Sequence, residues 1–317
     1  MMIDVLHARR RIAPYVLRTP LVRSAWLSDL AGASVWLKPE SLQRSNAFKA
    51  RGAFNAVIAR FERPGGPPAQ LVTASAGNHG RGLAAAARTF NLPLVVFTPA
   101  DAPKAKLDAI QRDGADLRPD GRDYDEAERM AKAFATQTGA EFISPYSDAD
   151  VIDGAATVAL EMFEDQPDLD TLVVPIGGGG LISGMATVAR AINPSCEVIG
   201  VELEVSNAFQ QSVAAGRLVE IVPGATLADG LGGNPDPETI TFALIQRLVD
   251  RIVTVSEADL VAAVIGLVEA EHLIAEGAGA AATAALIGKR IDVRGRRVGV
   301  VVSGGNIDRA RLAALLS

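Results

Sequence analysis

The chain has 317 residues, of which 49% are hydrophobic and 21% charged, and a net charge of −6. This composition predicts a folded protein with a packed core, organised as one large or two ordinary domains. The acidic balance, with no basic block, argues against nucleic acid or an anionic membrane surface as a partner.

The N-terminal residues and the cysteine content indicate the cellular compartment. Residues 1–11 carry charges throughout, so we expect neither a signal peptide nor a membrane-spanning segment. Cys196 is the only cysteine and cannot form an internal disulfide, which is typical of a reducing compartment. The sequence therefore favours a cytoplasmic protein.

The first half of the chain alternates helices with strands. Its periodicity predicts helices over 3–13, 24–31, 53–61, the alanine-rich stretch that ends at 90, 104–113 and 124–138. It predicts strands over 34–38, 71–74, 94–97, 115–118 and 141–143. From residue 71 onward the alternation is regular, which is typical of parallel strands joined by right-handed crossovers. This stretch could form a compact unit of its own.

The second half continues the same alternation. Strands are predicted over 172–175, 198–202, 252–255 and 298–302. Helices are predicted over 153–163, 181–192, 207–215, part of 235–250, a segment that Ser256 begins as N-cap, and 278–287. The predicted fold class is therefore α/β, with two lobes, and glycine loops at strand ends are where such folds bind ligands.

Lys49 follows Phe48 and stands at the head of the helix predicted over 53–61. A buried lysine amine is costly unless its pKa falls or the amine is bonded to another group. Lysines in that state form Schiff bases with carbonyl compounds. A surface lysine at a helix start is the ordinary alternative, but three glycine-rich loops follow and favour the Schiff base.

The most glycine-rich loop joins the strand at 172–175 to the helix at 181–192. Successive backbone N–H groups can turn inward there, and the helix N-terminus adds partial positive charge, so the loop is a candidate phosphate site. Its members are Gly177, Gly178, Gly179 and Gly180. Tight strand–helix packing is one alternative. Dinucleotide binding is another, since Glu202 follows the next strand, although Ile182 replaces the third glycine of the fingerprint.

Two further loops carry polar side chains at strand ends. Ser75 and the N–H groups around it could hold a carboxylate, and Asn78 could reach a phenolic oxygen, with helix capping as the alternative for Asn78 and His79. Ser303 could bond a weakly basic ring nitrogen, or it could belong to a plain turn. Together the lysine, the phosphate loop and these polar loops fit a phosphate-bearing aldehyde cofactor better than they fit NAD.

The same residues resemble a known family. The chain is similar to the fold-type II pyridoxal-phosphate enzymes, and within them to the serine/threonine dehydratase and serine racemase group, over about residues 10–310. The matching segments are 45–53, 75–79, 177–180 and 303–306. The resemblance implies two lobes, each with a mainly parallel twisted sheet covered by helices. It also implies a large cofactor-binding domain of residues 1–50 and 145–317, and a small domain of residues 51–144.

The resemblance assigns a role to each loop, with pyridoxal 5'-phosphate as the cofactor. Lys49 would form the Schiff base and remove the α-proton, Phe48 would pack near the ring, and Asn78 would bind the ring hydroxyl. The four glycines would bind the phosphate and Ser303 the ring nitrogen. The substrate site, with Ser75 also given a catalytic role, would comprise Ser75, Ala76, Asn78 and His79. A serine opposite the ring nitrogen favours β-elimination over transamination in this family.

Two positions depart from the family's pattern. Racemases of this group carry a second serine in the 75–79 loop, on the face opposite the lysine, where this chain has Ala76. Ala76 has no proton to give, so we expect dehydration of L-threonine or L-serine to a 2-oxo acid and ammonia rather than racemisation. Arg81 stands where relatives usually have glutamine. It could pair with a surface acid, or it could mark an anionic substrate such as 3-hydroxyaspartate.

The remaining expectations concern cations, assembly and competing functions. Some members bind Mg²⁺ or another divalent cation, and the resembling positions here are Glu204 and Ala208, with neutral Gln210 weakening the site. We expect a homodimer with a small-molecule amino-acid substrate. The alternatives are a dehydratase of 3-hydroxyaspartate or another hydroxylated amino acid, a serine racemase, a nucleotide-binding oxidoreductase, and a non-catalytic ligand-binding relative, against which Lys49 argues.

Overall fold

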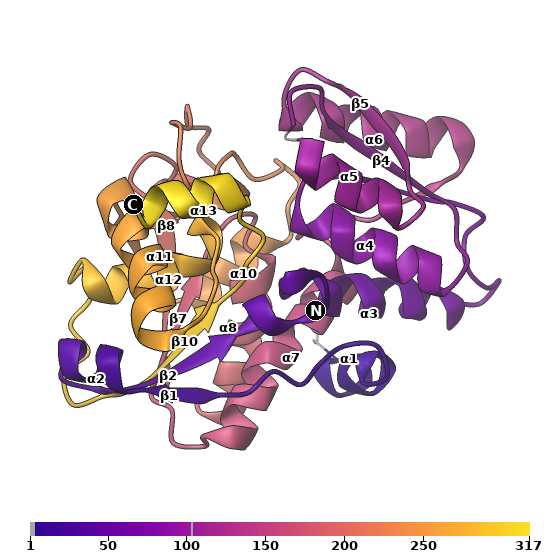
Figure 1. The fold of residues 1–317 in the computed structure, drawn as a ribbon. Coiled ribbons are helices and arrows are strands. Elements are labelled where there is room, and N and C mark those ends of the chain that lie inside the picture. Colours follow the sequence, from indigo (N-terminus) through magenta and orange to yellow (C-terminus); the bar gives the residue numbers. More distant parts are fainter. Residues whose placement is uncertain (1–3, 103) are drawn as a thin grey trace.

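A computed structural model describes residues 4–102 and 104–317, without the side chains of residues 104–106. It contains one six-stranded and one four-stranded sheet, each covered by helices, and Figure 1 shows them as two lobes. The predicted α/β class is confirmed. The helix predicted over 3–13 is α1, Val5–Ile12, and residue 3 lies outside the described residues.

The six-stranded sheet is parallel except at one edge. Its strand order is β1 (Val22–Ser24), β2 (Ser34–Pro39), β10 (Arg297–Val302), β7 (Thr171–Pro175), β8 (Glu197–Leu203) and β9 (Arg251–Val255). Only β1 is antiparallel, to β2. Strands of this kind, buried on both faces, are expected to be almost continuously apolar.

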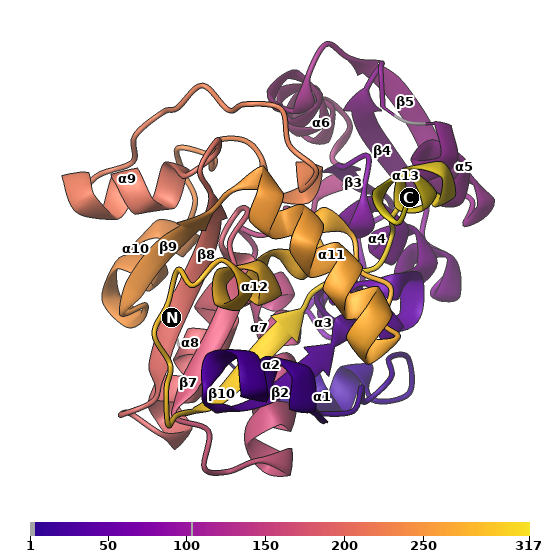
Figure 2. The same ribbon diagram turned by 60° about the vertical axis from the view of Figure 1, so that its left-hand side comes forward.

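Helices cover both faces of this sheet, and the side chains of each strand alternate between them. Val173 and Val300 point into one core, with α2 (Ala25–Ala31), α11 (Glu257–Glu271) and α12 (Gly277–Ile287). Leu172 and Val301 point into the other, with α7 (Ala149–Asp165) and α8 (Gly180–Ile192). Figure 2 shows α11 and α12 in front of the strands.

The four-stranded sheet is parallel throughout. Its order is β5 (Asp116–Gly121), β4 (Leu94–Pro99), β3 (Leu71–Ala74) and β6 (Glu141–Phe142). One face packs on α3 (Lys49–Phe61), α4 (Asn78–Thr89) and α5 (Lys104–Arg112), and the other on α6 (Tyr124–Thr138). All four strands lie within 51–144, although the domain boundaries themselves stay a prediction.

The remaining elements are short and connect the layers. They are α9 (Ala208–Ala215), α10 (Thr241–Leu248), α13 (Arg309–Leu315) and the 3-10 turns η1 (Glu40–Leu42), η2 (Arg44–Asn46) and η3 (Asp229–Leu231). No helix in the described ranges has the length and apolar character needed to cross a bilayer.

Local signals placed several helix ends correctly. Ser24 caps α2, accepting from the Leu27 N–H, and Gly32 ends that helix with φ 61°. Ser256 and Asp259 form a capping box at the start of α11. Two helices begin earlier in the chain than predicted. The helix expected at 53 begins at Lys49, and the helix expected at 153 begins at Ala149, after Asp148 as N-cap.

The topology brings the motif loops to one edge. Since β2, β10 and β7 are neighbouring parallel strands, their carboxyl ends lie together. Ser303 follows β10, and the four-glycine loop follows β7. The strand that leads to Ser75 belongs to the other sheet, so the contacts between the two sets of loops decide whether the predicted site exists.

Candidate active site

The lysine segment is joined directly to the loop after β10. The Phe48 N–H donates to the Ser303 carbonyl oxygen at 3.1 Å, and Ala47 forms an isolated bridge with Gly304. Two of the predicted motifs, from opposite ends of the chain, therefore share backbone hydrogen bonds.

Lys49 is the first residue of α3, and its side chain is partly buried. Its amine donates to the Pro145 carbonyl oxygen at 2.7 Å and lies 5.0 Å from the centre of the Phe48 ring. Burial lowers the pKa of Lys49 to about 8. The neutral fraction of this amine near neutral pH is therefore larger than that of an ordinary lysine, and the neutral form is the nucleophile.

A buried ionic cluster anchors the start of α3. Arg51, two residues after Lys49, donates to Glu40 at 2.8 Å and to Glu161 at 2.7 Å, and both carboxylates are buried. Lys38 completes the cluster at 2.6 Å from Glu161. Removing one partner from such a cluster leaves an uncompensated buried charge, at a cost of about 3–5 kcal/mol. The helix that carries Lys49 is thus fixed to Glu40, directly after β2, and to α7.

The four-glycine loop is a tight turn into α8. Gly179 has φ 84°, in the left-handed region, and caps the helix. No hydrogen bond joins the N–H groups of these four glycines to another described residue. Such unpaired N–H groups at a helix N-terminus form a site for an anion.

Packing also requires glycine in this loop. A Cβ placed on Gly178 would lie 2.2 Å from ring atoms of Tyr146. Tyr146 follows Pro145, whose carbonyl oxygen accepts from Lys49, so one segment lies against both the lysine amine and the glycine loop. Both interpretations of the loop, phosphate binding and close packing, fit this geometry. The sequence analysis did not find Tyr146, because the chain around it carries no motif.

Asn78 brings the second lobe to the site. Its Nδ2 donates to Glu276 Oε1 at 2.5 Å, and its Oδ1 accepts from Asn306 Nδ2 at 2.6 Å. Glu276 is the N-cap residue of α12, and Asn306 lies in the same loop as Ser303, after β10. The contacts of Asn78 thus connect α4 with both C-terminal segments. Glu276 also escaped the sequence analysis, although it stands directly before the alanine-rich helix.

The segment between β3 and α4 places the proposed substrate residues together. Ser75 Oγ accepts from the N–H groups of Gly77 at 3.2 Å and Gly80 at 3.0 Å, which leaves its own proton to donate. His79 is buried, and neither ring nitrogen has a well-formed hydrogen bond to the described residues. Burial, and then the positive charge of Lys49, lower the pKa of His79 to about 3. This imidazole is therefore neutral at physiological pH.

Ser303 and Arg81 complete the polar groups. The Ser303 side chain is buried and donates to the Ala278 carbonyl oxygen at 3.3 Å. Arg81 is partly buried and donates to the amide oxygen of Asn306, not to a surface acid. Burial, with nearby Arg112 in the same direction, lowers the pKa of Arg81. No acidic side chain of the described residues lies within ion-pair distance of this guanidinium.

The expected cation site at Glu204 and Ala208 is not supported. Glu204 pairs with Arg290 at 3.1 Å, and the Gln210 side chain donates to the Ile252 carbonyl oxygen at 3.0 Å. Glu202 accepts the Phe209 and Gln210 N–H groups and so caps α9. In the described ranges, no group of three or more His, Cys, Asp or Glu residues is arranged to hold a metal ion.

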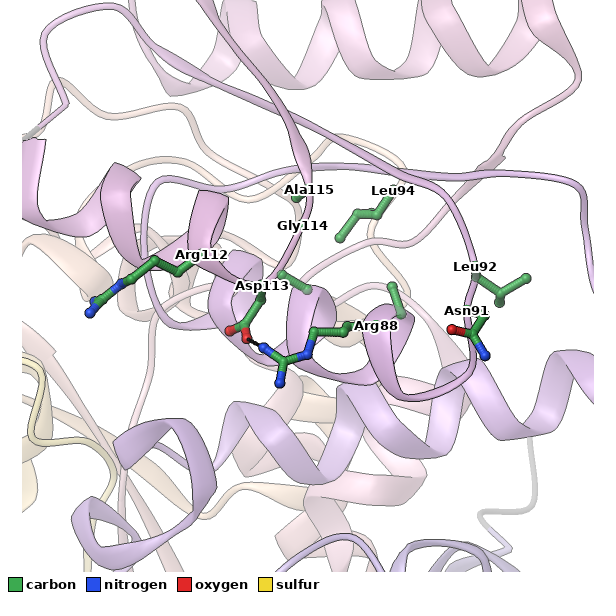
Figure 3. Close-up of a pocket in the computed structure, with 10 residues that line it drawn as sticks. Arg88, Asn91, Leu92, Leu94, Arg112, Asp113, Gly114 and Ala115 are labelled. Carbon is green, nitrogen blue, oxygen red and sulfur yellow. Dashed lines mark hydrogen bonds and ion pairs between the residues drawn. The ribbon is translucent and has the colours of Figure 1, made fainter.

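A surface pocket on the small lobe is separate from these loops. Arg88, Asn91, Leu94 and Arg112 are among the residues that line it, and Arg88 pairs with Asp113 at 3.0 Å, as Figure 3 shows. None of the motif residues lines it, so we do not assign it to the active site.

Comparison with known proteins decides the family. The model of the family described as "Pyridoxal-phosphate dependent enzyme" matches residues 12–304. The chain belongs to this family. The enzyme is 40% identical to an L-threonine ammonia-lyase of Thermotoga maritima, over 96% of this chain and 75% of that protein. It is 39% identical to an L-threo-3-hydroxyaspartate ammonia-lyase of Saccharomyces cerevisiae, over 99% and 95%.

A solved structure gives the same assignment. The structure of maize serine racemase has a TM-score of 0.90 to the enzyme at 34% identity, and the match covers 98% of this chain and 95% of that one. The predicted family, fold type and pyridoxal-phosphate dependence are confirmed, and the predicted class of ammonia-lyase is supported by the relatives at 35–40% identity. The oxidoreductase alternative is excluded by this family.

Proposed function

We propose that the enzyme removes water from a β-hydroxy amino acid, L-threonine or L-serine, and releases a 2-oxo acid and ammonia. The observation that carries this proposal is the position of the Lys49 amine. It is partly neutral, it contacts the segment that packs on the glycine loop, and Phe48 beside it is bonded to the Ser303 loop. The Lys49 amine, the glycine loop and the Ser303 loop therefore belong to one connected site in this proposal.

The residues of this place fit pyridoxal phosphate. In this proposal Lys49 binds the cofactor covalently, the N–H groups of the glycine loop hold its phosphate, and Asn78 and Ser303 hold polar atoms of its ring, which lies near Phe48. When bound, the cofactor supplies an electron sink for the bond that breaks at the substrate α-carbon. Lys49 is positioned to take the α-proton in its neutral form, and its lowered pKa increases the share of that form.

In this proposal the substrate carboxylate binds at the N-terminal end of α4. The Ser75 hydroxyl has a free proton, neutral His79 has an N–H group, and the helix N-terminus adds positive potential. A screen for 2-oxo acid release tests the function. L-threonine and L-serine are expected to react, and their D-isomers are expected to stay unreacted. Absence of 2-oxo acid with every β-hydroxy amino acid, in enzyme that holds its cofactor, would contradict the proposal.

We expect dehydration with little racemisation, because Ala76 offers only a methyl group where a proton donor is needed. A donor must lie within about 3 Å of the α-carbon, or one water away. In deuterated water the enzyme should form 2-oxo acid while unreacted L-serine keeps its configuration. Ala76→Ser should raise D-serine formation relative to elimination, and Ala76→Gly, which adds no hydroxyl, serves as the control. Wild-type enzyme that forms D-serine as fast as pyruvate would show another donor.

A second candidate substrate is 3-hydroxyaspartate, and Arg81 is the observation that favours it. Within the described residues this partly buried guanidinium is hydrogen-bonded to a neutral amide and in ion-pair contact with no carboxylate, which suits an anionic side chain. The relative named for this substrate also matches over nearly its full length.

Arg81→Gln should lower kcat/KM for L-threo-3-hydroxyaspartate relative to L-threonine by at least about tenfold, the equivalent of about 1.4 kcal/mol. The matched control is Arg88→Gln on the same helix, since Arg88 is already paired with Asp113. An unchanged ratio in Arg81→Gln would remove this candidate.

We also propose that the enzyme is a cytoplasmic homodimer. Leu42 and Ile274 support the dimer, because both are about half exposed, at 49% and 54%, and their segments pack against the same residue, Gly305. A sedimentation measurement tests this, since a mass near the 33.1 kDa of one chain would exclude the dimer.

A further inference from the structure

The turn before Lys49 has an unusual backbone. Ser45 and Asn46 have φ 58° and 57°, so two consecutive residues other than glycine lie in the left-handed region. This conformation is unfavourable for most side chains, although asparagine tolerates it better than serine, so the surrounding structure has to hold Ser45 in particular. The turn ends three residues before Lys49 and therefore sets the direction from which α3 begins.

The loop after β10 holds this turn. Asn306 Nδ2 donates to the Ser45 carbonyl oxygen at 2.8 Å, and the Gly305 N–H donates to the Asn46 carbonyl oxygen at 2.9 Å. Asn46 Nδ2 donates in return to Asn306 Oδ1 at 3.2 Å. Both carbonyls of the left-handed turn are thus bonded to the same short loop.

The same carboxamide also orients α4. Asn306 Nδ2 donates to Asn78 Oδ1 at 2.6 Å, and Asn306 Oδ1 accepts from Arg81. Asn78 then directs its own Nδ2 to Glu276 Oε1. One side chain therefore contacts the turn that precedes the lysine and the first turn of the helix that carries the proposed substrate residues.

We propose that Asn306 is a positioning residue that sets Lys49 and Asn78 in register with one another. It does so through the Ser45 carbonyl on one side and the Asn78 carboxamide on the other. This inference rests on the proposed function of Lys49 and Asn78. It predicts that the effect of Asn306 on Lys49 can be separated from its effect on Asn78. Only the effect on Lys49 acts through the left-handed turn at Ser45 and Asn46.

Three variants separate them. Asn306→Ala loses every contact of the carboxamide. Asn306→Asp keeps an acceptor for Arg81 and Asn46 but loses the donor to Ser45 and Asn78. In Asn306→Ala combined with Ser45→Gly, glycine adopts the left-handed conformation without needing to be held. Asn193→Ala is the control, because the Asn193 side chain bonds to the Leu169 carbonyl oxygen, away from these loops.

Each variant is measured for cofactor affinity by titration, for kcat and KM, and for melting temperature. We expect Asn306→Ala to bind cofactor about tenfold more weakly, as loss of hydrogen bonds predicts, and to lose about 100-fold in kcat/KM. Asn306→Asp should follow it in both. Adding Ser45→Gly should restore part of the lost cofactor affinity, because the turn before Lys49 no longer needs to be held. KM should stay raised, because Asn78 still lacks its donor.

Two results would overturn the proposal. One is an Asn306→Ala or Asn306→Asp enzyme with cofactor affinity, kcat and KM within about twofold of wild type. The other is a fall in cofactor affinity, kcat/KM and melting temperature together that Ser45→Gly does not repair. That result would show that Asn306 has a purely structural role. The cofactor titration needs no turnover, so it tests Asn306 even if the proposed substrates prove wrong. Should Asn306→Ala not fold, Asn306→Asp alone and with Ser45→Gly gives the same comparison.

Discussion

Lys49→Ala is expected to abolish turnover, with no 2-oxo acid above the rate of a blank without enzyme. The reason is that one amine is asked to perform two tasks, covalent attachment of the cofactor and transfer of the α-proton, and alanine can do neither. The variant should still fold, because the side chain makes a single hydrogen bond, to the Pro145 carbonyl oxygen. Circular dichroism and 2-oxo acid release check the two halves of this prediction.

Borohydride reduction gives the complementary control on wild-type enzyme. The cofactor should become fixed to Lys49 alone. Lys38 is the competing buried lysine, and burial lowers its pKa as well. Its amine, however, is ion-paired with Glu161 at 2.6 Å and donates to the Thr19 carbonyl oxygen, so these partners compete with attack on a carbonyl compound. A reduced cofactor on Lys38 or on any other lysine would overturn the assignment.

The pH dependence of cofactor uptake follows from the same amine. The neutral amine is the nucleophile, and Lys49 is neutral above its pKa, which burial lowers from 10.5 to about 8. The rate at which apoenzyme takes up the cofactor should therefore rise with pH and level off above about 8. A rate that keeps rising toward pH 10.5 would show an amine as exposed as a free lysine.

The alternation of strands and helices was sufficient to predict the α/β class, because buried parallel strands are short apolar runs whatever they pack against. It missed β1 and α13. In β1 two of the three residues are exposed, so the strand has little apolar signal and depends on pairing with β2. In α13 no residue is buried, so the helix lacks the apolar stripe on which periodicity depends.

The motif loops were predictable for the same kind of reason, since each has a distinctive composition at a strand end. Their partners were not. Tyr146 and Glu276 reach the site through contacts with segments distant in sequence, among them Gly178 and Asn78. Asn306 stands inside a predicted motif, yet its contacts with Ser45 and Asn78 depend on how the two sheets meet. Local pattern cannot supply such pairings.

Phosphate binding by the glycine loop has to be tested in a variant where a side chain at position 178 does not clash with its neighbours. Gly178→Asp in the wild type should weaken cofactor binding by well over tenfold, more than about 1.4 kcal/mol. Yet a Cβ on Gly178 would lie 2.2 Å from the Tyr146 ring, so any side chain there disturbs the loop. Tyr146→Ala removes the clashing ring and makes room for a substitution whose charge alone is varied.

The decisive pair is then Gly178→Asp against Gly178→Asn, each combined with Tyr146→Ala. The two side chains have the same shape and differ by one negative charge. If the N–H groups of this loop hold a phosphate, the aspartate variant should bind the cofactor at least about tenfold more weakly than the asparagine variant, because like charges repel at short range. The difference should shrink as salt is added, since ions screen a partly exposed pair. Cofactor titration at low and high salt measures both. Equal affinities for the aspartate and asparagine enzymes would mean that the four glycines serve close packing against Tyr146 and α10, and that the phosphate binds elsewhere.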